Sequence, residues 1–474
     1  MNWMLALPEL VLALSGLVIL VAGVCMKKED SFVPAAMLSI AAMGVTLFLV
    51  PLTPDGNGYG HVFVNDGFAR FLKILILAGG ILATIISIGY QRGSSRLPFE
   101  TPVLMLFSSL GAMLMASAGN LITLFVGLEL SSLSIYILCA IERDRLKSAE
   151  AGLKYFILGS LASGLLLYGI SLVYGFAGTM ELVPLSMIIA GQGGLPLGLQ
   201  IGMVFIIAGL AFKLSSVPFH MWTPDAYQGS PTPVTAYMAG APKFAAFALL
   251  LRLMAGPFGM AAPRWQILIE TIAGLSMLFG SLAAIPQTDI KRLMAYSSIG
   301  HMGYAMMGLA AASATGLRAT LVYLAAYLVM NAGVFAVIGA MRRGGREVTS
   351  IRDLSGLSRT HPGMALAMAV FMFSMVGVPP MAGFFGKFMV FASAWHAGLY
   401  GLLAVGGVSA LIGAYYYLRV VKVMYFDAPV QEFDSPAPSL SFVSAGMGVV
   451  TVFFLIGLGV ITSAAEIAAH AIAG

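Results

Sequence analysis

The sequence predicts an all-α polytopic membrane protein that crosses the bilayer about fourteen times. Of its 474 residues, 59% are hydrophobic and only 9% are charged, whereas a soluble domain carries roughly 25% charged residues. Apolar runs of about 20 residues, the length that spans a bilayer as a helix, recur from one end of the chain to the other. These runs do not alternate as the strands of a membrane β-barrel do.

Each apolar run is taken as one membrane-spanning helix. The first is read as a span because MNWMLALPEL lacks the basic segment and the cleavage site of a signal peptide. The predicted spans are 3–24, 32–51, 68–90, 101–118, 121–142, 151–176, 197–222, 231–254, 265–285, 290–311, 318–341, 363–396, 400–426 and 440–464.

Prolines predict breaks in helices 7 and 12. Pro218 lies in the seventh span and Pro379-Pro380 in the twelfth, which is too long for one crossing of about 20 residues and is expected to form two half-helices joined at 376–383. Because the breaks are five spans apart, they predict two inverted five-helix repeats, a common transporter architecture. The expected parts are an N-terminal three-helix segment (1–100), the first repeat (101–254), the second, inverted repeat (255–426) and a C-terminal helix (427–474).

The basic residues test this topology. Of the 25 Lys and Arg residues, sixteen fall on the loops or span ends of one side, five on those of the other side, and four inside spans. Since Lys and Arg gather in cytoplasmic loops, this bias predicts that both termini lie outside. The net charge of +5 is therefore explained by topology and is not evidence for nucleic-acid binding.

Three lysines lie deep inside predicted spans. Lys213 precedes the break at Pro218, Lys243 follows Pro242 in the eighth span, and Lys387 follows the second break. A lysine at the centre of a membrane helix costs about 2.5–3.5 kcal/mol on insertion scales. Broken helices also free backbone groups that protein or water must satisfy. We interpret these lysines as a hydrated proton path, with a purely structural ion pair as the alternative.

Glu129 and Lys154 are the other charged candidates. Glu129 is the only charged residue in LITLFVGLELSSLSIYIL. Opposite charges ~4 Å apart attract by about 4 kcal/mol at an effective dielectric of ~20, so a contact between Glu129 and Lys213 could switch whether the lysine holds its proton. Lys154 lies near a cytoplasmic span end, where it could join the path or extend to the lipid headgroups.

The histidines and cysteines bear on cofactors. His220 and His301 are the histidines inside spans, and we expect them to relay protons or to be packed and hydrogen-bonded, not to bind haem. Tyr296, Ser297, Ser298 and Tyr304 surround His301. Cys25 and Cys139 are too few for an iron–sulfur cluster, which needs four ligands, and no phosphate-binding or dinucleotide motif occurs. The sequence predicts no metal and no cofactor in this chain.

The longest basic loop, MRRGGREVTSIRDLSGLSRTHP, joins the eleventh and twelfth spans. Its predicted place is the cytoplasmic side, because of its arginines. Two roles fit it: a segment that orients the protein at the lipid headgroups, or a docking site for a partner protein.

Three segments resemble the antiporter-like membrane subunits of bacterial respiratory complex I. They are FKLSSVPFHMWTPDAYQGSPTPVTAYMAGAPKFAAF, DIKRLMAYSSIGHMGY and GVPPMAGFFGKFMVF, and SPTPVTAYMAGAPKFAAF is the most specific stretch. Lys387 separates the sequence from the related subunit M, which has a glutamate there. The resemblance covers essentially the whole chain.

The resemblance implies a proton-translocating subunit coupled to quinone reduction elsewhere in the complex. It implies that Glu129 pairs with Lys213, that Lys243 is the central relay lysine, and that Lys387 connects to the outer side. NADH, FMN, the iron–sulfur clusters and quinone would be bound by other subunits. The implied setting is the bacterial cytoplasmic (inner) membrane, beside membrane subunits such as M, K and J. Further polar positions on the family's proton route match Lys154, His220 and His301.

Other functions compete with this one. A subunit of a multi-subunit cation/proton antiporter or of a membrane-bound hydrogenase would share the fold and the lysines, and AGAPKFAAF with Lys387 favours complex I over both. A stand-alone solute transporter would carry substrate-selective polar groups at its breaks, where this chain has Lys, His and Glu. A structural scaffold is disfavoured by the cost of burying three lysines.

Overall fold

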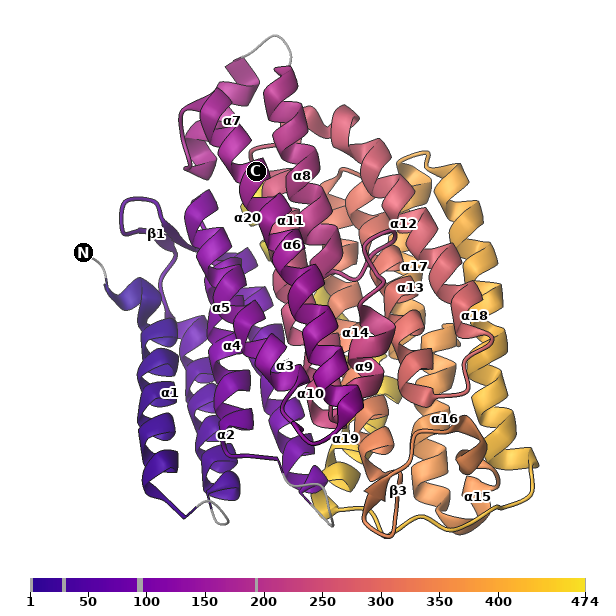
Figure 1. The fold of residues 1–474 in the computed structure, drawn as a ribbon. Helices are drawn as coiled ribbons and strands as arrows, with labels where there is room; N and C mark the ends of the chain where they lie inside the picture. The colour runs from indigo at the N-terminus through magenta and orange to yellow at the C-terminus, as the bar shows by residue number, and fades with distance from the viewer. Residues whose placement is uncertain (1–2, 28–30, 92–96, 192–194, 474) are drawn as a thin grey trace.

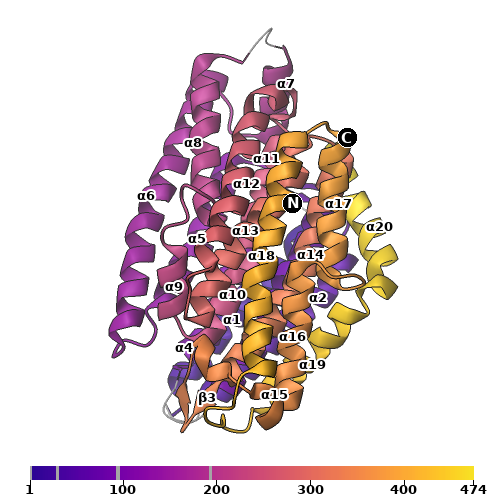
Figure 2. The same cartoon turned by 90° about the vertical axis from the view of Figure 1, so that its right-hand side faces the viewer.

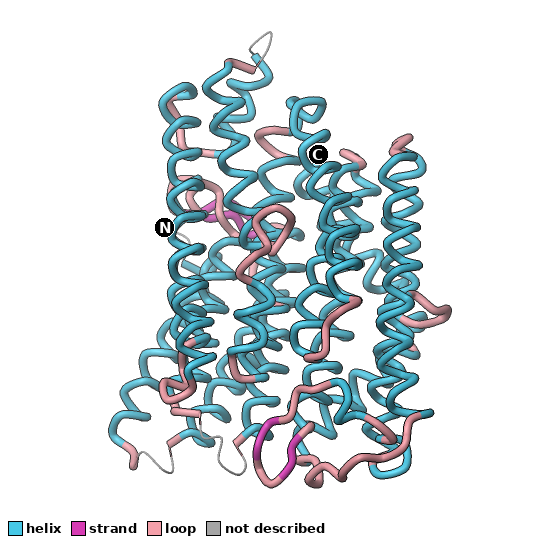
Figure 3. The backbone as a smooth tube through the Cα atoms, turned by 45° about the vertical axis from the view of Figure 1, so that its right-hand side comes forward, coloured by secondary structure: helices cyan, strands magenta, loops and turns pink. Residues whose placement is uncertain are grey.

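Long helices standing side by side make up nearly all of the protein (Figures 1 and 2). The structure is a computed structural model that describes residues 3–27, 31–91, 97–191 and 195–473. Lys28, Arg92 and Arg96, three of the basic residues assigned above to inner loops, lie outside the described residues. Figure 3 shows that most loops lie at the two ends of the bundle and that some lie at mid-height between helical stretches.

The first half of the bundle holds eleven α-helices of the described chain. They are α1 (Leu7–Cys25), α2 (Phe32–Leu49), α3 (Gly67–Tyr90), α4 (Glu100–Ala116), α5 (Leu121–Cys139), α6 (Leu146–Ala177), α7 (Leu182–Gly191), α8 (Leu197–Lys213), α9 (Thr223–Gly229), α10 (Thr232–Ala239) and α11 (Ala241–Ala255). Short 3₁₀ turns at Trp3–Ala6, Val50–Leu52 and Gly259–Ala261 extend α1 and α2 and precede α12.

The second half contains α12 (Ala262–Ala284), α13 (Ile290–Ala310), α14 (Ala314–Ala340), α15 (Leu357–Thr360), α16 (Pro362–Val376), α17 (Ala382–His396), α18 (Tyr400–Phe426), α19 (Pro438–Val452) and α20 (Phe454–Ala473). A 3₁₀ turn, Ile351–Leu354, precedes α15. Two small antiparallel hairpins occur in loops. β1 (Gly56–Gly58) pairs with β2 (Phe63–Asn65), and β3 (Arg342–Arg343) pairs with β4 (Arg346–Glu347).

The protein is an integral membrane protein. Among the described residues, ten helices are long and apolar enough to cross a bilayer. Each of the fourteen predicted spans coincides with a helix or a pair of half-helices, but α4, α8, α16 and α17 are shorter than a full crossing and α13 is less apolar. The all-α polytopic fold is thus confirmed, and the exact number of spans stays a prediction.

Both predicted breaks are present. α8 ends at Lys213 and α9 begins at Thr223, and α16 ends at Val376 before α17 begins at Ala382. The second break is closed by a tight contact, because Gly383 N–H donates to Ser374 Oγ at 3.0 Å. A Cβ at position 383 would lie 1.9 Å from the Ser374 carbonyl oxygen, so only glycine permits this approach.

Three features of the fold differ from the prediction. The eighth span is not continuous, since Gly240 separates α10 from α11; Pro242, which has no N–H, removes a helical hydrogen bond at this point. The fourteenth span is divided at Phe453 into α19 and α20. The loop between the sixth and seventh predicted spans contains α7, whose ten residues extend about 15 Å and cannot cross a membrane.

Two helical stretches form the centre of the bundle. In both α14 and the combined α10–α11, 94% of the most apolar window is buried, against 17% in α20. The start of α1 and the end of α20 lie toward the end of the bundle that carries α7, opposite β3 and α15 (Figure 1). We call these the α7 end and the β3 end. Of the three lysines, Lys213 and Lys243 are buried in this bundle, and Lys387 is half-buried.

Candidate functional site

Lys213 is held by two hydroxyl groups of α5. It is the last residue of α8, and its side chain is directed to α5, where Nζ donates to Ser132 Oγ at 2.8 Å and to Tyr136 OH at 3.0 Å. The side chain is buried. A buried ammonium group needs such acceptors because burial without them is costly.

Glu129 lies one turn before Ser132 on the same face of α5, since residues three and four apart are neighbours on a helix. The expected Glu129–Lys213 ion pair is absent among the described residues, where no salt bridge within 4.0 Å joins them. The Glu129 Oε1 atom is buried without a hydrogen-bond partner in the described chain. The hydroxyls of Ser132 and Tyr136 take the place of the carboxylate.

Lys243 joins three helices at the centre of the bundle. Its Nζ donates to Ser298 Oγ of α13 at 2.7 Å, and Ser298 Oγ lies 2.7 Å from Tyr327 OH of α14. The ammonium also lies 5.4 Å from the centroid of the Tyr227 ring. The side chain is 1% exposed, so these partners, and not bulk solvent, determine its environment.

His301 lies one turn beyond Ser298 on α13. Its Nδ1 is 2.7 Å from Tyr323 OH, and its Nε2 is 3.1 Å from Tyr417 OH. Its ring centroid is 5.3 Å from that of Tyr327, the tyrosine that also contacts Ser298. Hydrogen bonds thus join Lys243, Ser298 and Tyr327. His301 meets this chain through the ring contact with Tyr327, while its two nitrogens contact the hydroxyls of Tyr323 and Tyr417.

Lys387 closes the second break. Its Nζ donates to the carbonyl oxygens of Met375 and Val376 at 2.8 and 3.0 Å. These are the last carbonyls of α16, which have no helical partner because the helix stops there. Nζ also lies 4.9 Å from the centroid of the Tyr304 ring, and Tyr304 is 6.4 Å from Tyr323, ring to ring, next to His301.

Lys154 lies in an ion-pair cluster toward the β3 end. It contacts Glu150 at 2.7 Å and Asp225 of α9 at 2.8 Å, and Asp225 contacts Arg292 of α13 at 2.6 Å. The Lys154 side chain is 43% exposed, so its neighbours are partly polar protein groups and partly the surroundings of the protein. The pairing with Asp225 was not predicted.

His220 lies in the segment between α8 and α9. It is half-buried, its ring packs against Phe279 with centroids 4.6 Å apart, and its Nδ1 has no hydrogen-bond partner in the described part of the chain. It contacts neither Lys213 nor Lys243 by any hydrogen bond found among the described residues.

The structure thus divides the seven predicted site residues into groups. Lys243 and His301 lie on either side of Tyr327, and Lys213 contacts the α5 face that also carries Glu129. Lys154 and His220 have other neighbours, the carboxylates of Glu150 and Asp225 for Lys154 and the Phe279 ring for His220. Sequence reasoning missed the hydroxyls that make most of the contacts. The residues that were missed are Ser132, Tyr136, Tyr323, Tyr327 and Tyr417. Helical spacing could have indicated Ser132 and Tyr136, since these positions follow Glu129 by three and seven residues.

Metal ligands are not grouped in the described chain, where no set of three His, Cys, Asp or Glu side chains could hold a metal ion. Cys25 is exposed and Cys139 is buried, and neither forms a disulfide.

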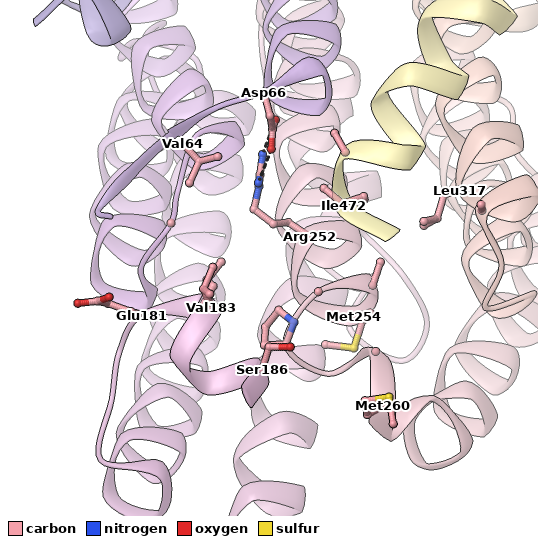
Figure 4. Close-up of a pocket in the computed structure, with 18 of the residues that line it drawn as sticks. Val64, Asp66, Glu181, Val183, Ser186, Arg252, Met254, Met260, Leu317 and Ile472 are labelled. Atoms are coloured by element: carbon pink, nitrogen blue, oxygen red, sulfur yellow. Dashed lines mark hydrogen bonds and ion pairs between the residues drawn. The ribbon is translucent and has the colours of Figure 1, made fainter. Parts of the chain in front are cut away.

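A cavity of about 920 Å³ opens at the α7 end, apart from the lysines. Figure 4 shows Arg252 of α11 and Asp66, the residue before α3, joined on its wall, with Glu181, Ser186 and Met260 nearby. Arg252 donates to both Asp66 oxygens at 2.9 and 3.0 Å. None of the seven predicted site residues is among the described residues that line this cavity.

Comparisons with known proteins show the family of the chain. A family model described as "NADH:quinone oxidoreductase/Mrp antiporter, TM" matches residues 118–413. NADH-quinone oxidoreductase subunit N of Gluconacetobacter diazotrophicus is 66% identical and that of Granulibacter bethesdensis is 55% identical, each over 100% of this chain and of the relative.

Solved structures give the same result. A chain of respiratory complex I from Thermus thermophilus with bound aureothin has a TM-score of 0.82 and 32% identity, covering 96% of this chain and 98% of its own. A chain of the Mrp complex from Dietzia sp. has a TM-score of 0.88 at 22% identity, over 100% of this chain and 98% of that one, and shares the fold. The fold alone thus does not separate the predicted alternatives, but the full-length identity to subunit N does.

The buried lysines at broken helices, the matching family model and the full-length relatives lead to one conclusion. The chain belongs to the NADH-quinone oxidoreductase subunit N family, the antiporter-like, proton-translocating membrane subunits of complex I.

Proposed function

We propose that this subunit moves protons along a relay built from Glu129, Lys154, Lys213, His220, Lys243, His301 and Lys387. The observation that carries the proposal is the central chain: Lys243 Nζ, Ser298 Oγ and Tyr327 OH are linked by contacts of 2.7 Å each. A hydroxyl both donates and accepts a hydrogen bond, so it can pass a proton between an amine and the next group without leaving its site.

The second part of the proposal concerns Lys213. Its ammonium has two sets of neighbours on one helix face, the hydroxyls of Ser132 and Tyr136, which it contacts, and the carboxylate of Glu129, which it does not. A move from the hydroxyls to the carboxylate would add an attraction of about 4 kcal/mol at ~4 Å and an effective dielectric of ~20. Such a move changes how firmly the lysine holds its proton.

The remaining residues extend the relay toward the two surfaces. Lys154, partly exposed and paired with Asp225, is suited to receive protons at the β3 end. His220, on the irregular segment between α8 and α9, has a buried Nδ1 without a described partner and can bind water. Lys387, beside Tyr304 and the free carbonyls of α16, is the proposed connection to the outer side.

The proposed orientation places the β3 end in the cytoplasm. The sixteen basic residues that the topology assigned to one side include Arg342, Arg343 and Lys291, which lie at this end with β3 and α13. Both termini would then be periplasmic and the membrane would be the bacterial inner membrane. In this arrangement, 1–100 is the three-helix segment, 101–254 and 255–426 are the inverted repeats, and 427–474 is the C-terminal part.

The proposed partners are membrane subunits of complex I that include M, K and J. The exposed apolar side chains that cover α1, α6 and α18 offer faces for lipid and for neighbouring subunits. NADH, FMN, iron–sulfur clusters and quinone would be bound by other subunits, and this chain would contribute proton transfer without a cofactor of its own.

The test uses inverted membrane vesicles from cells whose complex carries Lys243→Ala or Lys213→Ala, with other proton pumps blocked. We expect NADH-driven acidification to be lost while the complex stays assembled. Lys422→Ala is the matched control, because Lys422 is exposed and pairs only with Asp427 in the described chain. Unchanged acidification in both central variants, with sodium/proton exchange lost, would overturn the relay and favour an antiporter.

A further inference from the structure

A buried carboxylate lies outside the relay, in the loop that was predicted to meet lipid headgroups or a partner. Glu347, the last residue of β4, has a side chain that is only 5% exposed. Its Oε1 accepts from Thr232 Oγ1 and lies 3.4 Å from Lys291 Nζ, and its Oε2 lies 3.2 Å from Tyr90 OH and 3.5 Å from Arg145 Nη1. Both oxygens are therefore fully used within the protein.

These partners come from four different elements. Tyr90 is the last residue of α3, Arg145 directly precedes α6, Thr232 is the first residue of α10, and Lys291 is in the first turn of α13. Lys291, which is completely buried, also donates to the carbonyl oxygen of Ser230 at 2.5 Å. One carboxylate and one lysine thus tie the start of α10 to the start of α13.

The loop itself is fixed in place beyond β4. Ile290 N–H donates to Thr349 O at 2.8 Å, Ile351 N–H donates to Thr288 O at 2.9 Å, and Thr349 Oγ1 donates to Asp289 Oδ2 at 2.6 Å. The segment after Glu347 therefore pairs with the residues that lead into α13. It is part of the bundle's structure, in contrast to a free headgroup segment.

The helices that Glu347 joins, α10 with its continuation α11 and α13, are also in contact at the relay. α10 continues through Gly240 into α11, which carries Lys243, and α13 carries Ser298 two turns beyond Lys291, about 10 Å along the helix. The Lys243–Ser298 contact is 2.7 Å, and a hydrogen bond weakens sharply when its atoms separate beyond about 3.5 Å. A shift of about 1 Å of one helix against the other would therefore break it.

We propose that Glu347 is a positioning residue for proton transfer, which holds α10–α11 and α13 in the register where Lys243 meets Ser298. Its partners in the described chain include no group of the relay, and it acts through the ends of the two helices. Its negative charge is the feature that matters, because it is paired with the completely buried ammonium of Lys291, and a buried charge left without its partner is costly. The inference rests on the proposed relay.

The experiment compares Glu347→Gln, Ser298→Ala and the double variant in the whole complex. Glu347→Gln keeps the size of the side chain but removes its charge. We expect NADH-driven acidification per assembled complex to fall about tenfold. This is the smallest decrease in rate that corresponds to the loss of one hydrogen bond to a charged group. If Glu347 acts through the Lys243–Ser298 contact, the double variant is no slower than Ser298→Ala alone, since coupled changes are not additive.

Two further variants separate positioning from a general structural role. Glu347→Asp keeps the charge and is expected to recover most of the acidification. Asp427→Asn, which removes a half-buried carboxylate from a pair with the exposed Lys422, is expected to leave it unchanged. If Glu347→Gln does not assemble, Thr232→Val, which removes only the hydroxyl donor to Glu347, replaces it in the same double-variant comparison.

The outcomes distinguish the two proposals. Loss of acidification in Lys243→Ala with no change in Glu347→Gln, or losses that multiply in the double variant, would overturn the positioning role and leave the relay standing. Full acidification in Lys243→Ala would overturn the relay itself. Loss in both single variants without a further loss in the double variant would support both.

Discussion

The most direct test of the central relay is the removal of one hydroxyl, in Ser298→Ala. Ser298 Oγ accepts from Lys243 Nζ and contacts Tyr327 OH, each at 2.7 Å, and it is 1% exposed. Alanine keeps the helix and removes only the oxygen. Lys243 is also 1% exposed, so bulk solvent offers its ammonium group no ready replacement for this acceptor.

The size of the effect follows from the kind of contact that is lost. A hydrogen bond to a charged group contributes roughly 1.5–3 kcal/mol. At about 1.36 kcal/mol for each factor of ten, this is roughly a 10- to 150-fold decrease in the rate of any step in which the proton passes between Lys243 and Ser298. If that step is part of turnover, NADH-driven acidification falls by the same range.

The assay is acidification of inverted vesicles driven by NADH, normalised to the amount of assembled complex. Ser281→Ala is the matched control: Ser281 is a buried serine of α12 whose Oγ, among the described residues, donates only to the backbone carbonyls of Met277 and Leu278 in its own helix. A Ser298→Ala complex that assembles normally and acidifies as fast as the Ser281→Ala complex would refute the role assigned to the Lys243–Ser298 contact.

Three other predictions follow from individual contacts. Ser132→Ala removes one of the two hydroxyls that Lys213 contacts, and because the other remains we expect a loss of acidification below about tenfold; a loss as complete as that of Lys213→Ala would contradict this. Glu9→Gln leaves Lys73 without the carboxylate that lies 2.7 Å from it, which should lower the free energy of unfolding by about 3–5 kcal/mol and lower the denaturation temperature of the purified complex; an unchanged temperature would count against a stabilising ion pair. Burial raises the pKa of Glu347, but its positively charged and hydroxyl partners lower it by a larger amount. The net pKa therefore lies below the ordinary 4.5. Its ion pairs therefore persist at neutral pH and are lost only as the pH falls through that lowered value. The test is infrared spectroscopy at about pH 6: a protonated-carboxyl band that is present in the unchanged protein and absent from Glu347→Gln would disprove this prediction.

Much of the architecture could be predicted from local sequence. Hydropathy depends on the residues within one span, and a proline acts on its own helix, so both signals can be read locally. The structure has a helix or a pair of half-helices at each predicted span, and it has the breaks at Pro218 and Pro379-Pro380. The division of the eighth span at Gly240 was missed although Pro242 lies beside it. A single glycine in an apolar run gives no reliable sign of a break, because membrane helices tolerate glycine.

The candidate site could be predicted in its residue types but not in its contacts. The cost of burying Lys213, Lys243 and Lys387 made them stand out without any knowledge of the fold. Their partners could not be identified in this way, because Ser and Tyr are common in apolar helices and carry no charge to mark them. Tyr327 is distinguished from other tyrosines only by its distance from Ser298.

The sequence by itself determined the membrane class, the helices, the breaks and the presence of buried lysines, because each depends on neighbouring residues and on the energy of transfer into lipid. Only the tertiary structure decided that Lys213 contacts hydroxyls in preference to Glu129, that Lys387 satisfies the free carbonyls of α16, and that Glu347 joins α10 to α13. These contacts bring together residues far apart in the chain. Packing sets their distances, and hydrogen bonds depend on differences of less than 1 Å, which no local pattern encodes.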